Sequence, residues 1–316
     1  MEQDLGEFRK TVYKLYLEGK YTEALETAEE ASTRFRDEIS ETSFWIACLD
    51  CVLHEENEAL RILESSLGAG AWWSPRQLET ERDLDPLKSR QEFKGILEEC
   101  RQRFEKKQKE SRPERLVFCP ENLDEKKKHP LFVALHMKGG NTEETSKHWM
   151  HVVKRGHILL VPQSSQLFGP KEYCWDDWNT SKKEVLGHIN EIKGSYNIDE
   201  DGIVVAGASQ GASVGIIDLV FGNTSLDLRK CIAVVPAVDD LSFYTPLLES
   251  AARRGVRAYV LSGEKDHFLE NTKKLYQEMT KAGIHCKLEV VRGLGHDFPP
   301  NFDDYIDEAL NYLEAT

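Results

Sequence analysis

The spacing of apolar residues along the chain changes near residue 110. Before that point apolar residues recur every three or four positions, as Val12, Leu15 and Tyr16 do, and this period is typical of amphipathic helices. A glycine-containing turn over residues 18–21 interrupts the first pair of periodic segments, and a polar break over residues 55–57 interrupts a second pair. The first hundred residues are therefore predicted to form helical hairpins.

Residues 101–115 are almost entirely charged, and Pro113 ends any helix that runs into them. Glutamates are interleaved with the lysines and arginines, so the segment reads as the solvated end of a helix followed by a linker. The sequence therefore predicts two domains, a helical domain over 1–108 and a second domain over 114–316.

In the second domain, short apolar runs alternate with helical patterns, which favours an α/β fold with a mostly parallel sheet flanked by helices. The first two runs are separated by a charged turn and are typical of a β-hairpin. The expected strands cover 116–119, 131–135, 158–161, 203–205, 231–235, 258–261 and 288–291, and the expected helices cover 183–196, 209–221, 245–254, 269–282 and 303–313.

Composition narrows the classes of partner. The chain has 316 residues, 40% of them hydrophobic, and a formal net charge of −14, so the extended basic surface that nucleic acid requires is not expected. No apolar run approaches the length of a membrane span, and the polar start of the chain is unlike a signal peptide, which predicts a cytoplasmic protein. Seven irregularly spaced cysteines favour reduced thiols, and the CxxC of Cys48 and Cys51 favours a packed helical face.

The stretch 203–215, IVVAGASQGASVG, combines a β-branched run, a glycine-rich corner and a helical pattern. Gly207, Ser209 and Gly211 have the G-x-S-x-G spacing of a nucleophile elbow, in which a strained serine needs neighbours without side chains. Ser209 is therefore the candidate nucleophile.

A serine hydroxyl needs a general base, and imidazole suits that role near neutral pH. His296 follows the last expected strand in RGLGHDFP, and Asp266 follows the preceding strand in LSGEKDHF, where it could orient the imidazole. Asp239 and Asp240 follow another strand and are alternatives for the acid. The spacing of the other histidines predicts no metal site, and no cofactor is expected.

The motifs GASQG, SGEKDHF, GLGHDFP and LHMKGGN together resemble those of α/β-hydrolases, over about residues 115–316. The nearest groups are the carboxylesterase, phospholipase/carboxylesterase and dienelactone-hydrolase-like enzymes. The resemblance implies a Ser209, Asp266, His296 triad. It also implies an oxyanion hole made by the backbone amides of Gln210 and Lys138, with Met137 as the alternative to Lys138, although those families carry His-Gly where this chain has His136 and Met137.

The helical segment over about residues 5–104 resembles tetratricopeptide repeats, on the strength of GKYTEALETAEEA and a repeat offset of about 35 residues. Partner binding, homo-oligomer formation and a lid are all roles that such a domain could have.

A long loop, SSQLFGPKEYCWDDWNTS, follows the third strand of the second domain and carries Phe168, Tyr173, Trp175 and Trp178. Aromatic residues at the active-site edge of a sheet suggest an apolar pocket, so Phe168, Trp175 and Trp178, together with Met137, are expected to bind substrate. The function predicted from the sequence is a serine esterase that acts on small or medium acyl esters or thioesters. The alternatives are a serine peptidase of the same fold and a partner-binding repeat protein with a vestigial hydrolase domain.

Overall fold

The computed structural model describes residues 4–124, 126–222 and 224–315, and the chain divides into two compact units after Glu110. Unit 1 is Met1–Glu110 and unit 2 is Ser111–Thr316. The bounds 1–108 and 114–316 stay a prediction for the domains.

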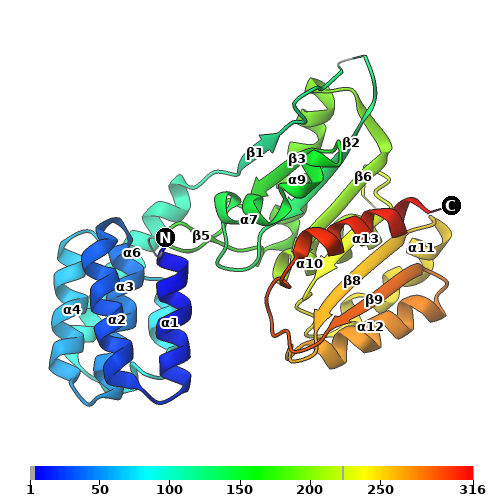
Figure 1. Ribbon diagram of the computed structural model, residues 1–316. Coiled ribbons are helices and arrows are strands. Elements are labelled where there is room, and N and C mark those ends of the chain that lie inside the picture. The colour runs from blue at the N-terminus through cyan, green and yellow to red at the C-terminus, as the bar shows by residue number, and fades with distance from the viewer. Residues whose placement is uncertain (1–3, 125, 223, 316) are drawn as a thin grey trace. The chain divides into compact units, whose positions relative to one another are not determined.

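Unit 1 is built from helices that follow one another closely in the chain (Figure 1). Helices α1 to α4 each pack on the next one, as expected for helical hairpins. The inner face of α2 carries Ala24, Ala28 and Ala31, all fully buried, and such small residues let neighbouring helices approach. The helices are α1 (Leu5–Leu17), α2 (Tyr21–Arg34), α3 (Ile39–Val52), α4 (Glu56–Gly68), α5 (Pro75–Thr80) and α6 (Gln91–Glu110), with short 3-10 turns at Arg36–Glu38 and Asp85–Leu87.

The core of unit 1 also holds the two cysteines of the CxxC and a pair of tryptophans. Cys48 and Cys51 are buried free thiols, and burial raises the pKa of the Cys51 thiol to about 12. Trp73 is almost fully buried and donates its indole N–H to the Ser40 carbonyl at 2.6 Å. These side chains therefore belong to the packing of the helices.

Seven strands of unit 2 form one sheet in the order β1-β3-β2-β6-β7-β8-β9. All neighbours are parallel except β1, which runs antiparallel to β3. The parallel strands therefore end at one common edge. The strands are β1 (Glu114–Phe118), β2 (His129–Leu135), β3 (Ile158–Gln163), β6 (Ile198–Ala208), β7 (Lys230–Val234), β8 (Arg257–Gly263) and β9 (His285–Val291).

The expected hairpin between the first two strands is wrong, because β1 pairs with β3 and not with β2. Burial explains the order. Both faces of β3 are buried along its whole length, which suits an interior strand, whereas β1 is exposed or half-buried throughout, which suits an edge.

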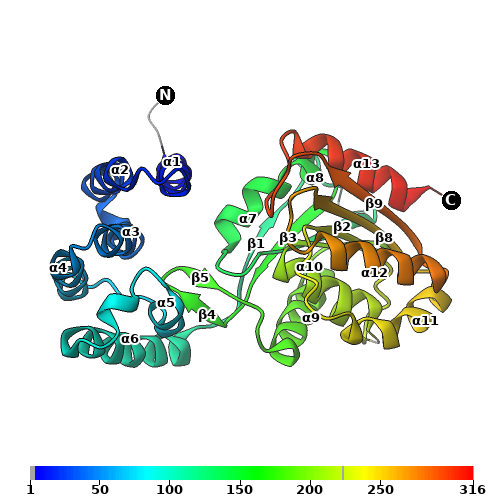
Figure 2. The same cartoon turned by 90° about the horizontal axis from the view of Figure 1, so that it is seen from below.

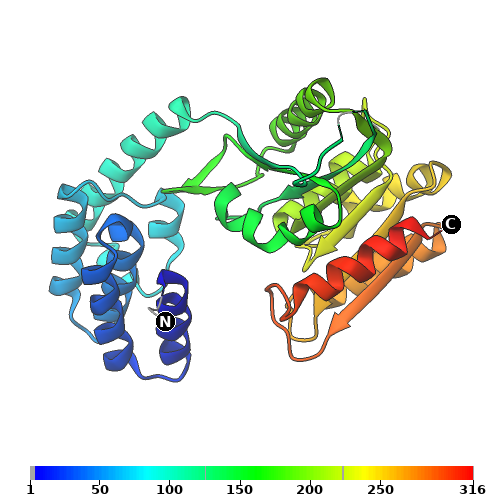
Figure 3. The ribbon, with the colours of Figure 1, turned by 45° about the horizontal axis from the view of Figure 1, so that its top comes forward.

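Helices cover both faces of the sheet, as Figures 2 and 3 show. One face packs against α7 (Thr142–Trp149), α8 (His151–Lys154) and α13 (Phe302–Glu314). The other packs against α9 (Trp178–Ser195), α10 (Gln210–Val214), α11 (Thr245–Arg253) and α12 (Leu269–Lys281). The alternating side chains of β2 supply both layers: Leu131, Val133 and Leu135 face the second set, and Phe132 and Ala134 face the first.

Some elements were not expected from the sequence. Helix α7 reads TEETSKHW, which has too few apolar positions to show a helical period. Its N-cap residue is Asn141, whose side chain accepts the Glu144 N–H. The long loop that carries Phe168, Tyr173, Trp175 and Trp178, here named the aromatic loop, contains a small hairpin. It pairs β4 (Leu167–Gly169) with β5 (Glu172–Tyr173). After α10 the chain continues as a π-helix over Gly215–Phe221, and a 3-10 turn covers Leu241–Phe243. Among the described residues, no helix has both the length and the apolar character needed to cross a bilayer.

Truncation of Leu63 tests the packing of unit 1. Leu63 is fully buried on α4, so Leu63→Ala is expected to lower the free energy of unfolding by about 2–5 kcal/mol. Leu17→Ala is the matched control, because Leu17 is 66% exposed and its loss should change stability by less than about 0.5 kcal/mol. Urea denaturation measures both, and equal effects would contradict the described core.

Candidate active site

Ser209 lies at the sharp turn between β6 and α10, with φ of 52° and ψ of −120°. A side chain in this backbone region costs on the order of 1–3 kcal/mol, so the surroundings must hold it there. The Ser209 N–H donates to the Val234 carbonyl at 3.0 Å, and the Ser209 carbonyl accepts the Ala237 N–H at 3.2 Å. The end of β7 therefore holds the turn.

Steric crowding explains the glycines on either side of Ser209. A Cβ on Gly207 would lie 2.6 Å from the Gly211 carbonyl carbon, and a Cβ on Gly211 would lie 2.4 Å from the His136 carbonyl oxygen. Both contacts are with backbone atoms, which cannot rotate away. The G-x-S-x-G spacing is thus required by the close approach of β6, α10 and the segment after β2.

Ser209, His296 and Asp266 form a chain of hydrogen bonds. The Ser209 Oγ lies 2.9 Å from His296 Nε2, and His296 Nδ1 lies 3.0 Å from Asp266 Oδ1. The three residues follow β6, β9 and β8, whose ends share one edge of the sheet. The Asp266 side chain is fully buried, whereas the His296 side chain is 23% exposed. This arrangement lets the imidazole accept the Ser209 proton while Asp266 orients the ring.

Two further donors hold the Asp266 carboxylate. The Phe268 N–H donates to Oδ1 at 3.0 Å, and the Ser262 hydroxyl donates to Oδ2 at 3.3 Å. The loop that carries His296 passes very close to this segment, since a Cβ on Gly263 would lie 2.3 Å from the carbonyl oxygens of both Leu294 and Gly295. The absence of a side chain at Gly263 thus brings the acid and the imidazole within reach of each other.

The alternative acids lie elsewhere. Asp239 and Asp240 are exposed, and Asp240 accepts the Ser242 N–H at 2.8 Å as the cap of a 3-10 turn. Asp297 accepts the N–H of Phe298. The structure places Asp266 against His296, and the Asp240 and Asp297 carboxylates bond to neighbouring backbone N–H groups.

The segment after β2 holds His136 in one protonation state. His136 Nδ1 donates to the Met137 carbonyl at 2.8 Å, and its Nε2 accepts the Ser164 N–H at 3.3 Å. The ring is fully buried, which lowers the pKa of His136 to about 4. His136 is therefore neutral at pH 7. It stacks on Trp175, with ring centroids 4.4 Å apart, and shapes this turn.

The Met137 carbonyl also accepts the Gly140 N–H at 3.0 Å. Because the peptide bond is trans, the Lys138 N–H points opposite to that carbonyl and away from its two donors. This orientation leaves the Lys138 amide outside the hydrogen bonds that close the turn. The half-buried Met137 side chain packs partly on the core beneath α7 and α13.

Asp176 joins the side chains of the two expected oxyanion-hole residues. Lys138 Nζ donates to Asp176 Oδ1 at 2.6 Å and Oδ2 at 2.9 Å, and Gln210 Nε2 donates to Asp176 Oδ1 at 2.7 Å. Gln210 Oε1 in turn accepts the Trp175 N–H at 2.9 Å. Asp176 lies in the aromatic loop, but no pattern in the sequence distinguishes it, because the contact depends on tertiary placement.

The aromatic residues of the loop have different surroundings. Trp175 is fully buried and donates its indole N–H to the His136 carbonyl at 2.8 Å, so it supports the turn after β2. Phe168 is half-buried beside Gly139 and Lys138. Trp178 is half-buried and its ring lies edge-on to the exposed Phe243. Tyr173 exchanges backbone hydrogen bonds with Gly139 and Gly140.

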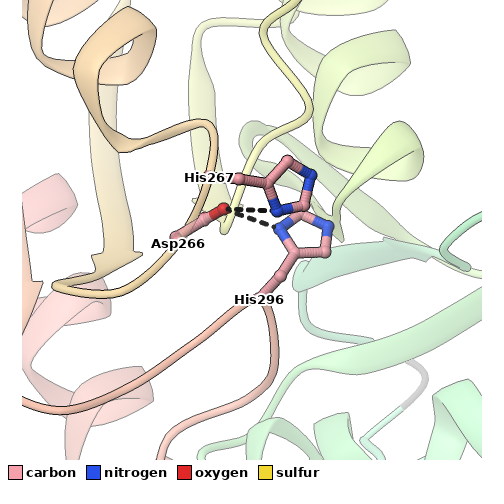
Figure 4. Close-up of side chains that lie close together, drawn as sticks. All are labelled: Asp266, His267 and His296. Carbon is pink, nitrogen blue, oxygen red and sulfur yellow. Dashed lines mark hydrogen bonds and ion pairs between the residues drawn. The ribbon is translucent and has the colours of Figure 1, made fainter.

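One group of potential metal ligands occurs among the described residues. Asp266, His267 and His296 offer ligand atoms within 4.8 Å of one another (Figure 4). His267 follows Asp266 directly, and its side chain is 67% exposed.

The comparisons with solved structures show that unit 2 has the α/β-hydrolase fold. The chain is similar over 99% of its length to 99% of an uncharacterized protein from Bacillus cereus ATCC 10987, with 24% identity and a TM-score of 0.55. It is also similar to a ferulic acid esterase, at 17% identity over 64% of this chain and 91% of that one, and to the esterase PE8, at 15% identity over 63% and 99%; both TM-scores are 0.51.

Unit 1 has a match of its own. Residues 7–108 match the family model described as the A/B hydrolase-like N-terminal domain. The tetratricopeptide resemblance stays a prediction. No curated protein sequence matches this chain.

The buried His136 leads to a prediction about pH. Because its folded-state pKa of about 4 lies below the unfolded value of about 6.5, the unfolded chain binds a proton first as pH falls. As the pH is lowered from 6.5 to 4, His136 is therefore expected to decrease the free energy of unfolding by about 3 kcal/mol. Ring ¹⁵N shifts should show a neutral imidazole protonated on Nδ1 down to pH 5. A cationic ring at pH 6 would contradict this assignment.

Proposed function

We propose that this protein is a serine hydrolase that cleaves carboxylic esters or thioesters through an acyl-enzyme intermediate. The hydrogen-bonded chain from Ser209 through His296 to the buried Asp266 carries the proposal. The strained backbone at Ser209 adds support, because strain of this kind is retained where the surrounding structure enforces it.

In the first half of the reaction, His296 Nε2 takes the Ser209 proton while Oγ bonds to the acyl carbon. The tetrahedral intermediate then collapses, the bond to the alcohol or thiol breaks, and the imidazolium gives its proton to the leaving group. Water repeats the sequence on the acyl-enzyme and releases the acid. Asp266 keeps the Nδ1 proton in place and stabilises the imidazolium in both halves.

The oxyanion is assigned to the backbone amides of Lys138 and Gln210. Gln210 begins α10 directly after Ser209, so its N–H is one of the helix donors without an intrahelical acceptor. The Lys138 N–H points away from the bonds that close its turn. Donors held in this way stabilise developing charge without reorganising, and removal of one typically costs about 10²–10³ in kcat.

The surroundings of Lys138 favour an uncharged acyl group. Its ammonium is paired with Asp176 at 2.6 Å and lies 5.4 Å from the centre of the Phe168 ring, so its charge is already balanced. Phe168, Met137 and Trp178 are the half-buried apolar candidates for substrate contact. A small or medium neutral acyl ester fits these residues, and two of the similar structures are esterases.

A fluorophosphonate probe tests the mechanism. Wild-type protein should be labelled at Ser209 and should hydrolyse p-nitrophenyl acyl esters, because the probe reacts only with an activated serine. Ser209→Ala should abolish labelling and reduce turnover by at least about 10⁴-fold. Ser195→Ala is the matched control, since Ser195 is an exposed serine at the end of α9 whose hydroxyl bonds to the Glu191 carbonyl of the same helix.

The same assay distinguishes the alternatives. Turnover of peptide substrates in preference to esters would replace esterase with peptidase. Folded wild-type protein that neither reacts with the probe nor hydrolyses any ester or peptide would contradict the hydrolase proposal and favour a partner-binding role for unit 1.

Asp176→Asn tests whether the side-chain contacts of Lys138 and Gln210 position the oxyanion hole. The substitution keeps the shape but removes the charge that binds the ammonium, so kcat for an ester should fall about 10-fold with little change in KM. Asp239→Asn is the control, because Asp239 is an exposed carboxylate after another strand. An Asp176→Asn enzyme with wild-type kcat would assign the contacts to stability alone.

A further inference from the structure

We propose that Asp266, His267 and His296 form a binding site for a transition-metal dication such as Zn²⁺, and that occupation of this site reversibly inhibits the enzyme. The inference rests on the proposed hydrolase function. Its structural basis is a second imidazole beside the carboxylate that orients the first (Figure 4).

The ligand atoms are already gathered. Asp266 Oδ1 lies 3.0 Å from His296 Nδ1 and 3.7 Å from His267 Nδ1, and one atom from each residue lies within 4.8 Å of the others. Ligands of a tetrahedral zinc ion with bonds near 2.1 Å lie about 3.4 Å apart. A small rotation of His267, which is the most exposed of the three, would complete the set.

Burial and charge favour a cation at this point. The Asp266 side chain is fully buried, so its negative charge is poorly screened by water, while the 67% exposed His267 side chain gives an ion a path from solvent. Two imidazole nitrogens and one carboxylate oxygen suit Zn²⁺, Cu²⁺ or Ni²⁺, whereas Mg²⁺ and Ca²⁺ prefer oxygen ligands alone.

Metal binding would disable His296 through its tautomer. In the metal-free arrangement His296 carries its proton on Nδ1, which donates to Asp266, and Nε2 accepts from Ser209. A metal on Nδ1 displaces that proton, and a neutral imidazole then carries its proton on Nε2. Nε2 can only donate in that state, so it cannot take the proton of Ser209. No net proton is lost from the ring.

Zinc titration of wild type, His267→Ala and His285→Ala tests the site. Ester hydrolysis and fluorophosphonate labelling by the wild type should be inhibited by Zn²⁺, restored by EDTA and unaffected by Mg²⁺. His267→Ala should keep its basal activity and need about 10–100-fold more Zn²⁺ for half inhibition. His285→Ala removes an exposed histidine at the start of β9 and should behave as the wild type.

Calorimetric titration of the Ser209→Ala variant with Zn²⁺ reads the site without any activity. One equivalent should bind, and the Ser209→Ala/His267→Ala double variant should lose about 10–100-fold in affinity. If the wild type showed no hydrolysis but Ser209→Ala still bound Zn²⁺ as expected, the hydrolase proposal would be contradicted and the metal site would be supported. Equal inhibition of wild type and His267→Ala, or no inhibition of the wild type, would overturn the metal site.

Discussion

The candidate site depends on backbone segments that approach more closely than side chains allow. At Gly207, Gly211 and Gly263 an added Cβ would meet carbonyl or backbone atoms of another segment at 2.3–2.8 Å. Two of these contacts form the turn around Ser209, and the third joins the loops that carry Asp266 and His296. The parallel sheet already brings its strand ends to one edge. The close approaches of the backbone then bring Ser209, His296 and Asp266 within hydrogen-bond distance of one another along that edge.

A second layer beneath the site links the turn after β2 to the start of α10. His136 and Trp175 stack and share a hydrogen bond, and Asp176 beside them bonds the side chains of Lys138 and Gln210. Where related motifs have a glycine after the histidine, this chain has Met137, whose carbonyl accepts from both His136 and Gly140. The side-chain network thus provides the rigidity on which preorganised donors depend.

The sequence predicts most of the parallel sheet, because each strand is a short apolar run bounded by polar residues. Ser209, Asp266 and His296, which the structure brings into one chain of hydrogen bonds, could be picked out for the same reason: each follows such a run, and parallel strands end together. The partner of β1 was missed because neighbours in the chain favour a hairpin, whereas burial of β3 decides the order. Helix α7 could not be predicted because its sequence has no apolar period. Asp176 could not be predicted because its partners, Gln210 and Lys138, lie 34 and 38 positions away in the chain.

The surroundings of Asp266 connect its proposed catalytic role with the proposed metal site. A buried carboxylate must be matched by donors, and Asp266 receives them from Phe268, Ser262 and His296. Those three donors account for a carboxylate that holds the proposed catalytic imidazole. His267 is additional to them: its Nδ1 stands 3.7 Å from Oδ1, too far for a hydrogen bond but near enough for a shared ion. In the proposed site, a metal would therefore bind His296 at Nδ1, the same nitrogen that otherwise carries the proton in the hydrogen bond to Asp266.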